Sequence, residues 1–140
     1  MYRKSLDASR GLAVFRMGAP TSEEWDEHFQ DLDLIATWSK QLGFRASVVV
    51  APAATFELPD ARRRAELAEK TGQPGYDCHV AILHPNGVAR GLLTMIQWMR
   101  GTSGTVQRAF ATEQEALTWL ESARGESLPE LGAMLAETLR

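Results

Sequence analysis

Residues 106–120, VQRAFATEQEALTWL, are the part of the chain that most restricts its fold. The segment ending at Phe110 predicts a short strand, and a two-residue turn follows it. Thr112 and Glu115 then have the spacing of a capping box, in which each side chain binds a backbone N–H that the first helical turn leaves free. Behind the box an apolar stripe continues at helical spacing, formed by Ala116, Leu117, Leu120 and Ala123. A strand that leads directly into a helix predicts an α/β fold.

The same order of strands and helices is expected along the rest of the chain. A second capping box, Thr21 with Glu24, predicts a long helix whose apolar positions recur every three or four residues up to Leu42. Gly43 has the place of a left-handed helix cap. We expect strands over 2–8, 12–17, 46–51 and 78–83, a polar helix over 60–70 and a last helix over 127–140.

The segment from Val88 to Met99 has two interpretations. Asn86-Gly87 between apolar runs is typical of a hairpin turn, which would pair 88–93 with the strand at 78–83. Helical spacing, however, continues through Leu92 and Ile96 to Met99. We expect a helix and keep the hairpin as the alternative.

Strands that alternate with helices predict a mainly parallel sheet with right-handed crossovers. We therefore expect an α/β fold: a small sheet of four to five strands, with an antiparallel N-terminal edge hairpin, helices packed on it and an extra C-terminal helix. Residues 1–124 form the predicted domain, and 125–140 the amphipathic extension. Ser127 and Glu130 predict a third capping box there. That helix could cover its own sheet or pack on a second copy of the chain.

Composition excludes several classes of protein. A net charge of −3 argues against a nucleic-acid binder that depends on phosphate contacts. One cysteine, Cys78, rules out an intramolecular disulfide. No window approaches the roughly 18 uninterrupted apolar residues of a membrane span, and the N-terminus lacks the apolar run of a signal peptide. We expect a cytoplasmic protein with no stable membrane insertion.

Candidate catalytic groups do not combine into a site. Cys78 and His84 share a strand face but lie roughly 20 Å apart along it, and His79 points to the other face. Such a distance is too large for one metal ion or a nucleophile–base pair. Arg62-Arg63-Arg64 has acidic neighbours at pairing distance, and Gly101–Thr105 leads from a helix into a strand, the wrong order for a phosphate loop. We expect no catalytic residues, no metal and no cofactor.

A group of core and capping residues near the C-terminal end of the domain resembles the SpoIIAA-like family, a branch of the STAS and SEC14-like α/β group. The strand-to-helix entry at 18–25 and Ala81-Ile82-Leu83 support the resemblance. The residues that carry it are Val106, Phe110, Glu115, Ala116, Trp119 and Leu120.

The resemblance implies a non-enzymatic domain. STAS relatives are protein-binding modules switched by phosphorylation of a serine in an Asp-Ser loop, and SEC14-like relatives hold an apolar ligand. The corresponding loop here, 51–59, has no Asp-Ser pair, and Thr55 is its one hydroxyl. The phosphorylation switch is therefore not carried over.

We expect a non-catalytic interaction or regulatory module that binds a protein partner and forms a homodimer. The expected contact lies in the loops 51–58 and 84–90, at the carboxyl ends of the strands, with Phe56 as the anchor beside Thr55, His84, Asn86 and Arg90. The alternative is a carrier of a lipid or other apolar molecule, in a cavity lined by Trp25, Trp38 and Trp98.

Overall fold

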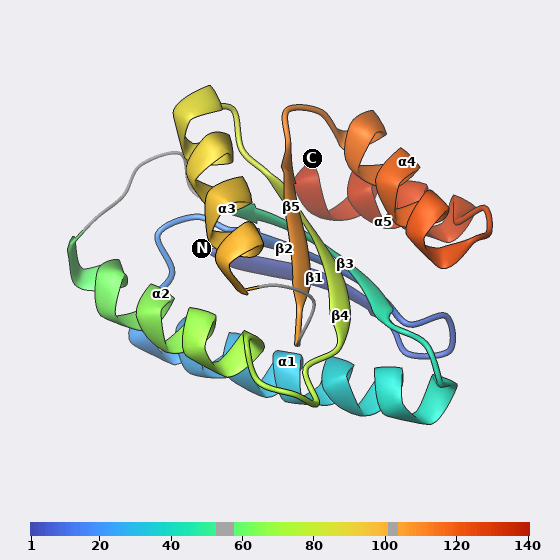
Figure 1. Ribbon diagram of the computed structural model, residues 1–140, viewed down its shortest axis with the longest axis horizontal. Helices are drawn as coiled ribbons and strands as arrows, with labels where there is room; N and C mark the ends of the chain where they lie inside the picture. The colour runs from blue at the N-terminus through green and yellow to red at the C-terminus, as the bar shows by residue number, and fades with distance from the viewer. Residues whose placement is uncertain (53–57, 101–103) are drawn as a thin grey trace.

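The structure, a computed structural model, describes residues 1–52, 58–100 and 104–140, without the side chains of 58–61, 96 and 98–100. Its centre is one five-stranded sheet in the order β1-β2-β3-β4-β5 (Figure 1). β1 pairs antiparallel with β2, and all later pairs are parallel. This confirms the expected mainly parallel sheet with an antiparallel edge hairpin. The strands are β1 (Tyr2–Asp7), β2 (Leu12–Met17), β3 (Ala46–Pro52), β4 (Cys78–Leu83) and β5 (Val106–Phe110).

The described residues form five helices. Each parallel crossover steps one strand further in the same direction, and crossovers are right-handed as a rule, so the first two connecting helices lie on one side of the sheet, and the third lies beside its last strand. The last two helices cover the other side (Figure 1). The segment at 87–100 is the expected helix and not the hairpin. The helices are α1 (Ser22–Leu42), α2 (Leu58–Thr71), α3 (Gly87–Arg100), α4 (Glu113–Arg124) and α5 (Pro129–Leu139).

Strand alternation divides the core between the two layers. On one face, Phe15 and Val48 pack with the α1 side chains Trp25, Ile35 and Trp38. On the other face, strand residues pack against α4 and α5; this second cluster contains Leu12, Val14, Val49, Ala81, Ala116, Leu120, Leu131 and Leu135. β2 and β3 are therefore buried from both sides, as the continuous apolar run at 46–51 predicts.

Most of the helix caps that the sequence predicts are present in the structure. Thr21 and Glu24 form the complete capping box at the start of α1, and Gly43 ends the helix with a φ of 76°. At the start of α4 the Thr112 side chain accepts the Glu115 N–H, which is one half of the expected capping box. Gly104, with a φ of 71°, has no room for a side chain, because an added Cβ would lie 2.6 Å from the Thr71 carbonyl oxygen.

The expected capping box of the last helix is wrong. Leu128 is the residue before α5, and no side chain of its own caps the helix. Glu121 of α4 instead accepts from the Ser127 hydroxyl at 3.2 Å and from the Leu128 N–H at 2.6 Å. A carboxylate from the preceding helix therefore replaces the cap that the sequence predicts. α5 packs on its own sheet, since Leu128, Leu131, Met134 and Leu135 belong to the α4-side core.

A partly buried polar cluster joins β1 to α1. The Tyr2 hydroxyl donates to Asp31 Oδ2 at 2.7 Å, so the His28 Nδ1–H, 3.0 Å away, donates to the Tyr2 oxygen. Lys4 Nζ lies 2.9 Å from carboxylate oxygens of both Asp31 and Glu27. Burial lowers the pKa of His28 to about 4, and burial followed by the neighbouring Asp31 raises the pKa of Tyr2. His28 is thus held neutral in the fold.

We predict that acidification destabilises the protein through His28. Its pKa is lowered from 6.5 to about 4, so the unfolded chain binds the extra proton between these values. The contribution is complete above pH 6.5 and is lost as the pH falls towards 4; at about 1.4 kcal/mol per pKa unit it amounts to roughly 3 kcal/mol. Urea unfolding of the native chain and of His28→Gln, at several pH values across this window, measures it. The difference in unfolding free energy between the two should shrink on acidification, and a constant difference would contradict the assignment.

Candidate functional site

The structure brings together His84 and Asn86, in the turn between β4 and α3, and Arg90, in the first turn of α3. Asn86 Oδ1 accepts the N–H groups of Val88 and Ala89 at 2.9 and 3.2 Å, which makes it the cap of α3. His84 Nδ1 accepts the Asn86 N–H at 3.1 Å, and Arg90 Nη1 donates to the His84 carbonyl at 2.8 Å. These three side chains therefore build the turn, and their binding role stays a prediction.

The other predicted residues are divided between the core and the part of the chain not described. Thr55 and Phe56, and the side chain of Trp98, lie outside the described residues. Trp25 and Trp38 are buried in the α1-side core. The Trp25 ring contacts His28 and Phe29, with centroids 6.2 and 6.1 Å away. The two tryptophans therefore have protein side chains as neighbours where the carrier alternative places a ligand.

Helix α3 exposes apolar side chains that a helix of this kind normally buries. Val88, Leu92 and Met95 are 75%, 55% and 54% exposed. Their spacing of four and three residues places them on one helical face, together with the exposed Gly91. We call Val88, Gly91, Leu92 and Met95 the α3 stripe. In most soluble helices a stripe with this spacing faces the core.

The polar side of α3 faces the sheet because the helix lies beside an edge strand. β5 has a strand neighbour on one side only, and α3 lies along the other (Figure 1). Gln97 Oε1 accepts the N–H of Gln107 in β5 at 2.7 Å. Arg90, which lies on the same helical face as Gln97, donates to the backbone carbonyl of His84. Polar contacts with the edge of the sheet thus turn the α3 stripe towards solvent.

Two further properties of the α3 stripe bear on what it could contact. No residue between 88 and 95 other than the inward-turned Arg90 is charged, and α3 contains no acidic residue. Gly91 lies in the interior of the helix, and a Cβ added there would meet nothing within 4 Å. The stripe is therefore uncharged, and it has a shallow point at Gly91 that the chain itself does not fill.

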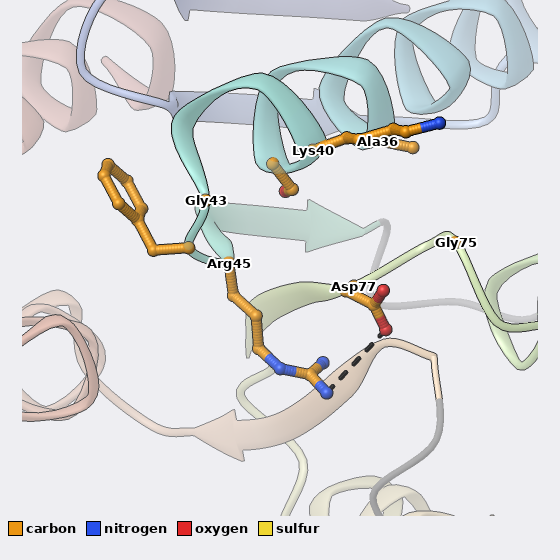
Figure 2. Close-up of a pocket in the computed structure, with 8 residues that line it drawn as sticks. Ala36, Lys40, Gly43, Arg45, Gly75 and Asp77 are labelled. Carbon is orange, nitrogen blue, oxygen red and sulfur yellow. Dashed lines mark ion pairs between the residues drawn. The ribbon is translucent and has the colours of Figure 1, made fainter.

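An open cavity of about 480 Å³ lies at the amino-terminal ends of the strands, opposite the end where the 84–90 turn lies (Figure 2). Arg45 and Asp77 point towards each other there, with Nη2 and Oδ1 3.8 Å apart, and Arg45 also donates to the Gly104 carbonyl. Ser39 Oγ accepts the Ala46 N–H at 2.9 Å. Parallel sheets usually bind ligands at the carboxyl ends of their strands. The polar groups named here also have partners within the chain. We therefore do not place the functional site in this cavity.

The remaining reactive side chains are separated by the sheet, as the sequence predicts. Cys78 lies in the α1-side core, and burial raises the pKa of its thiol to about 11. His79 lies on the other face, with its ring centroid 5.7 Å from that of Trp119. Among the described residues no three His, Cys, Asp or Glu side chains are grouped to hold a metal ion. No helix in the described ranges is long and apolar enough to cross a membrane.

The contact loop predicted at 84–90 includes Val88, but sequence reasoning missed Leu92 as a candidate contact residue. The signal in the sequence is a helix with two opposite faces. One face has apolar residues at 88, 92 and 95, and the other has polar residues at 90, 94 and 97. Alone, such a helix predicts a buried apolar face. Only its position beside the last strand of the sheet reverses the direction in which each face points.

Comparison with known proteins supports the fold alone. No family model matches the chain, and no curated protein is similar to it in sequence. One solved structure that matches is the crystal structure of an uncharacterised protein of the DUF3478 family from Shewanella loihica PV-4, described as having a SpoIIAA-like fold. It is 17% identical, has a TM-score of 0.54 and covers 86% of this chain and 95% of its own. The resemblance expected from the sequence is thus confirmed as a similarity of architecture: the chain has a SpoIIAA-like fold.

Proposed function

We propose that this chain is a non-catalytic interaction module that binds a protein partner through the α3 stripe. The observation that carries the proposal is the outward turn of Val88, Leu92 and Met95, which are each more than half exposed. The stripe begins at Val88, within the predicted contact loop 84–90, so it extends the contact region that the sequence predicts at the carboxyl ends of the strands. Contiguous exposed apolar side chains on a folded domain mark interaction sites.

The edges of the sheet offer less favourable contacts than the α3 stripe. β1, at one edge, has exposed charged residues, Arg3 and Lys4, which discourage the addition of a foreign strand. β5, at the other edge, has α3 beside it, and Gln97 of this helix accepts the outward N–H of Gln107. A partner would therefore bind to side chains and not to a free strand edge.

The chemistry of the described nucleophiles supports a non-catalytic role. The Cys78 thiol is buried and has a raised pKa, so it is not the reactive thiolate. His84 uses Nδ1 to hold the turn, and His28 uses Nδ1 to bind Tyr2. These groups stabilise the fold. The carrier alternative is the lesser proposal, because no observation comparable to the α3 stripe favours it.

Site-specific photo-cross-linking tests the proposed contact. We predict that a photoreactive phenylalanine analogue at position 92 gives a protein adduct in cells that express the full chain. The matched control is position 34, because Leu34 is also an exposed leucine on a helix, at 45% against 55% for Leu92. An adduct at 92 that is absent at 34 supports the proposal. If neither position reacts, or if both react equally, the α3 stripe is not a specific protein contact.

A further inference from the structure

We propose that the α3 stripe is covered by a second copy of this chain, with the two α3 helices packed antiparallel about a two-fold axis near Gly91 and Leu92. This inference rests on the proposed function of the stripe as a protein contact. It names the partner by three properties of the described residues: the absence of charge in the stripe, the shallow point at Gly91 and the covering of the β5 edge.

The absence of charge is what a symmetric contact requires. Near a two-fold axis each charged side chain meets its own copy, so like charges oppose each other. The α3 stripe has no charged member, and Arg90 is turned away to the His84 carbonyl. An acidic peptide or an anionic membrane would need cations beside the stripe. An uncharged apolar surface is complementary to another copy of itself.

Gly91 fixes the direction of packing. Nothing lies within 4 Å of a Cβ built at this position, and glycine in a helix interior lowers helix stability relative to alanine. In an antiparallel pair Leu92 of one copy lies over Gly91 of the other, and Val88 lies opposite Met95. A parallel pair would instead oppose Leu92 to Leu92 and Gly91 to Gly91, with large residues against large and a gap between the glycines. The antiparallel pair also opposes the two helix dipoles.

Stable interfaces bury about 800 Å² on each partner, and a contact between a single pair of helices buries less than that. We therefore expect a weak dimer with a dissociation constant in the micromolar range, on the order of 10 µM. Since Gln97 and α3 cover the β5 edge, the association adds no strand to the sheet.

Sedimentation over a concentration series is the first test. The full chain should move from 15.5 kDa towards twice that mass as its concentration rises. Leu92→Asp should weaken the association at least about tenfold, because it places two carboxylates at the axis. Leu34→Asp, an equal change on the exposed side of α1, should leave it unchanged. A monomer at all concentrations, or an equal effect of both variants, overturns the proposal.

Cysteine cross-linking tests the direction of packing. The native thiol of Cys78 is buried, so single-cysteine additions at the surface report on their own position. Val88→Cys mixed with Met95→Cys should give a mixed dimer with a short bismaleimide in much higher yield than either variant alone. Efficient cross-linking of Val88→Cys to itself would indicate a parallel pair and would overturn the proposal.

Gly91→Ala separates packing between copies from folding. In dilute monomer the substitution should raise the thermal midpoint, since alanine is the better helix former and the added methyl meets no atom. At high concentration the same methyl should weaken self-association several-fold, because it occupies the space of Leu92 in the second copy. Unchanged or stronger association in this variant would overturn the packing at Gly91.

The photo-cross-linking at position 92 distinguishes this inference from the proposed function. An adduct of twice the chain mass supports both. An adduct with a different protein and none with a second copy overturns the self-association while the protein-contact function stands. No adduct overturns both.

Discussion

The burial of β2 and β3 from both sides is the constraint on which the rest of this structure depends. Leu12, Ala13, Val14 and Phe15 have no exposed surface, although alternate residues point to opposite faces of the sheet. Each face therefore needs its own helical cover. The crossover helices supply only one layer, so α4 and α5 must close the other. α5 is consequently part of the core, although the sequence presents it as an addition to a domain.

Much of the fold can be predicted from the sequence because the signals are local or periodic. The 106–120 segment predicts a strand followed by a helix, and the Thr21–Glu24 box predicts the start of a helix. Neither prediction depends on the rest of the chain. The box at Ser127 and Glu130 fails for a tertiary reason, since Glu121 from the preceding helix accepts the Ser127 hydroxyl and the Leu128 N–H, and the helix begins one residue later than the box requires. A capping-box spacing involves only residues of one helix, so it cannot predict a cap that a residue of another helix provides.

The candidate site is harder to predict than the fold. His84, Asn86 and Arg90 lie together because they are close in the chain, at the turn that leads into α3, and such a turn can be predicted from the sequence. The direction in which α3 presents its two faces depends on where the helix lies in the finished sheet. At the edge, backbone groups of β5 require polar partners, and this requirement outweighs the usual burial of an apolar stripe. The strongest candidate surface therefore arises where helical periodicity alone predicts core.

The bond between Gln97 and the Gln107 N–H separates two properties that are often linked in sheet proteins. An open edge strand is both a means of recognition and a route to fibrous aggregation, because any extended chain can pair with it. Here one amide side chain accepts one outward donor of β5, the Gln107 N–H, within the molecule. In the function that we propose, recognition uses the side chains of α3, whose shape can select a partner. Under this proposal, sequence variation in the α3 stripe would alter what the protein binds without opening the sheet to indiscriminate growth.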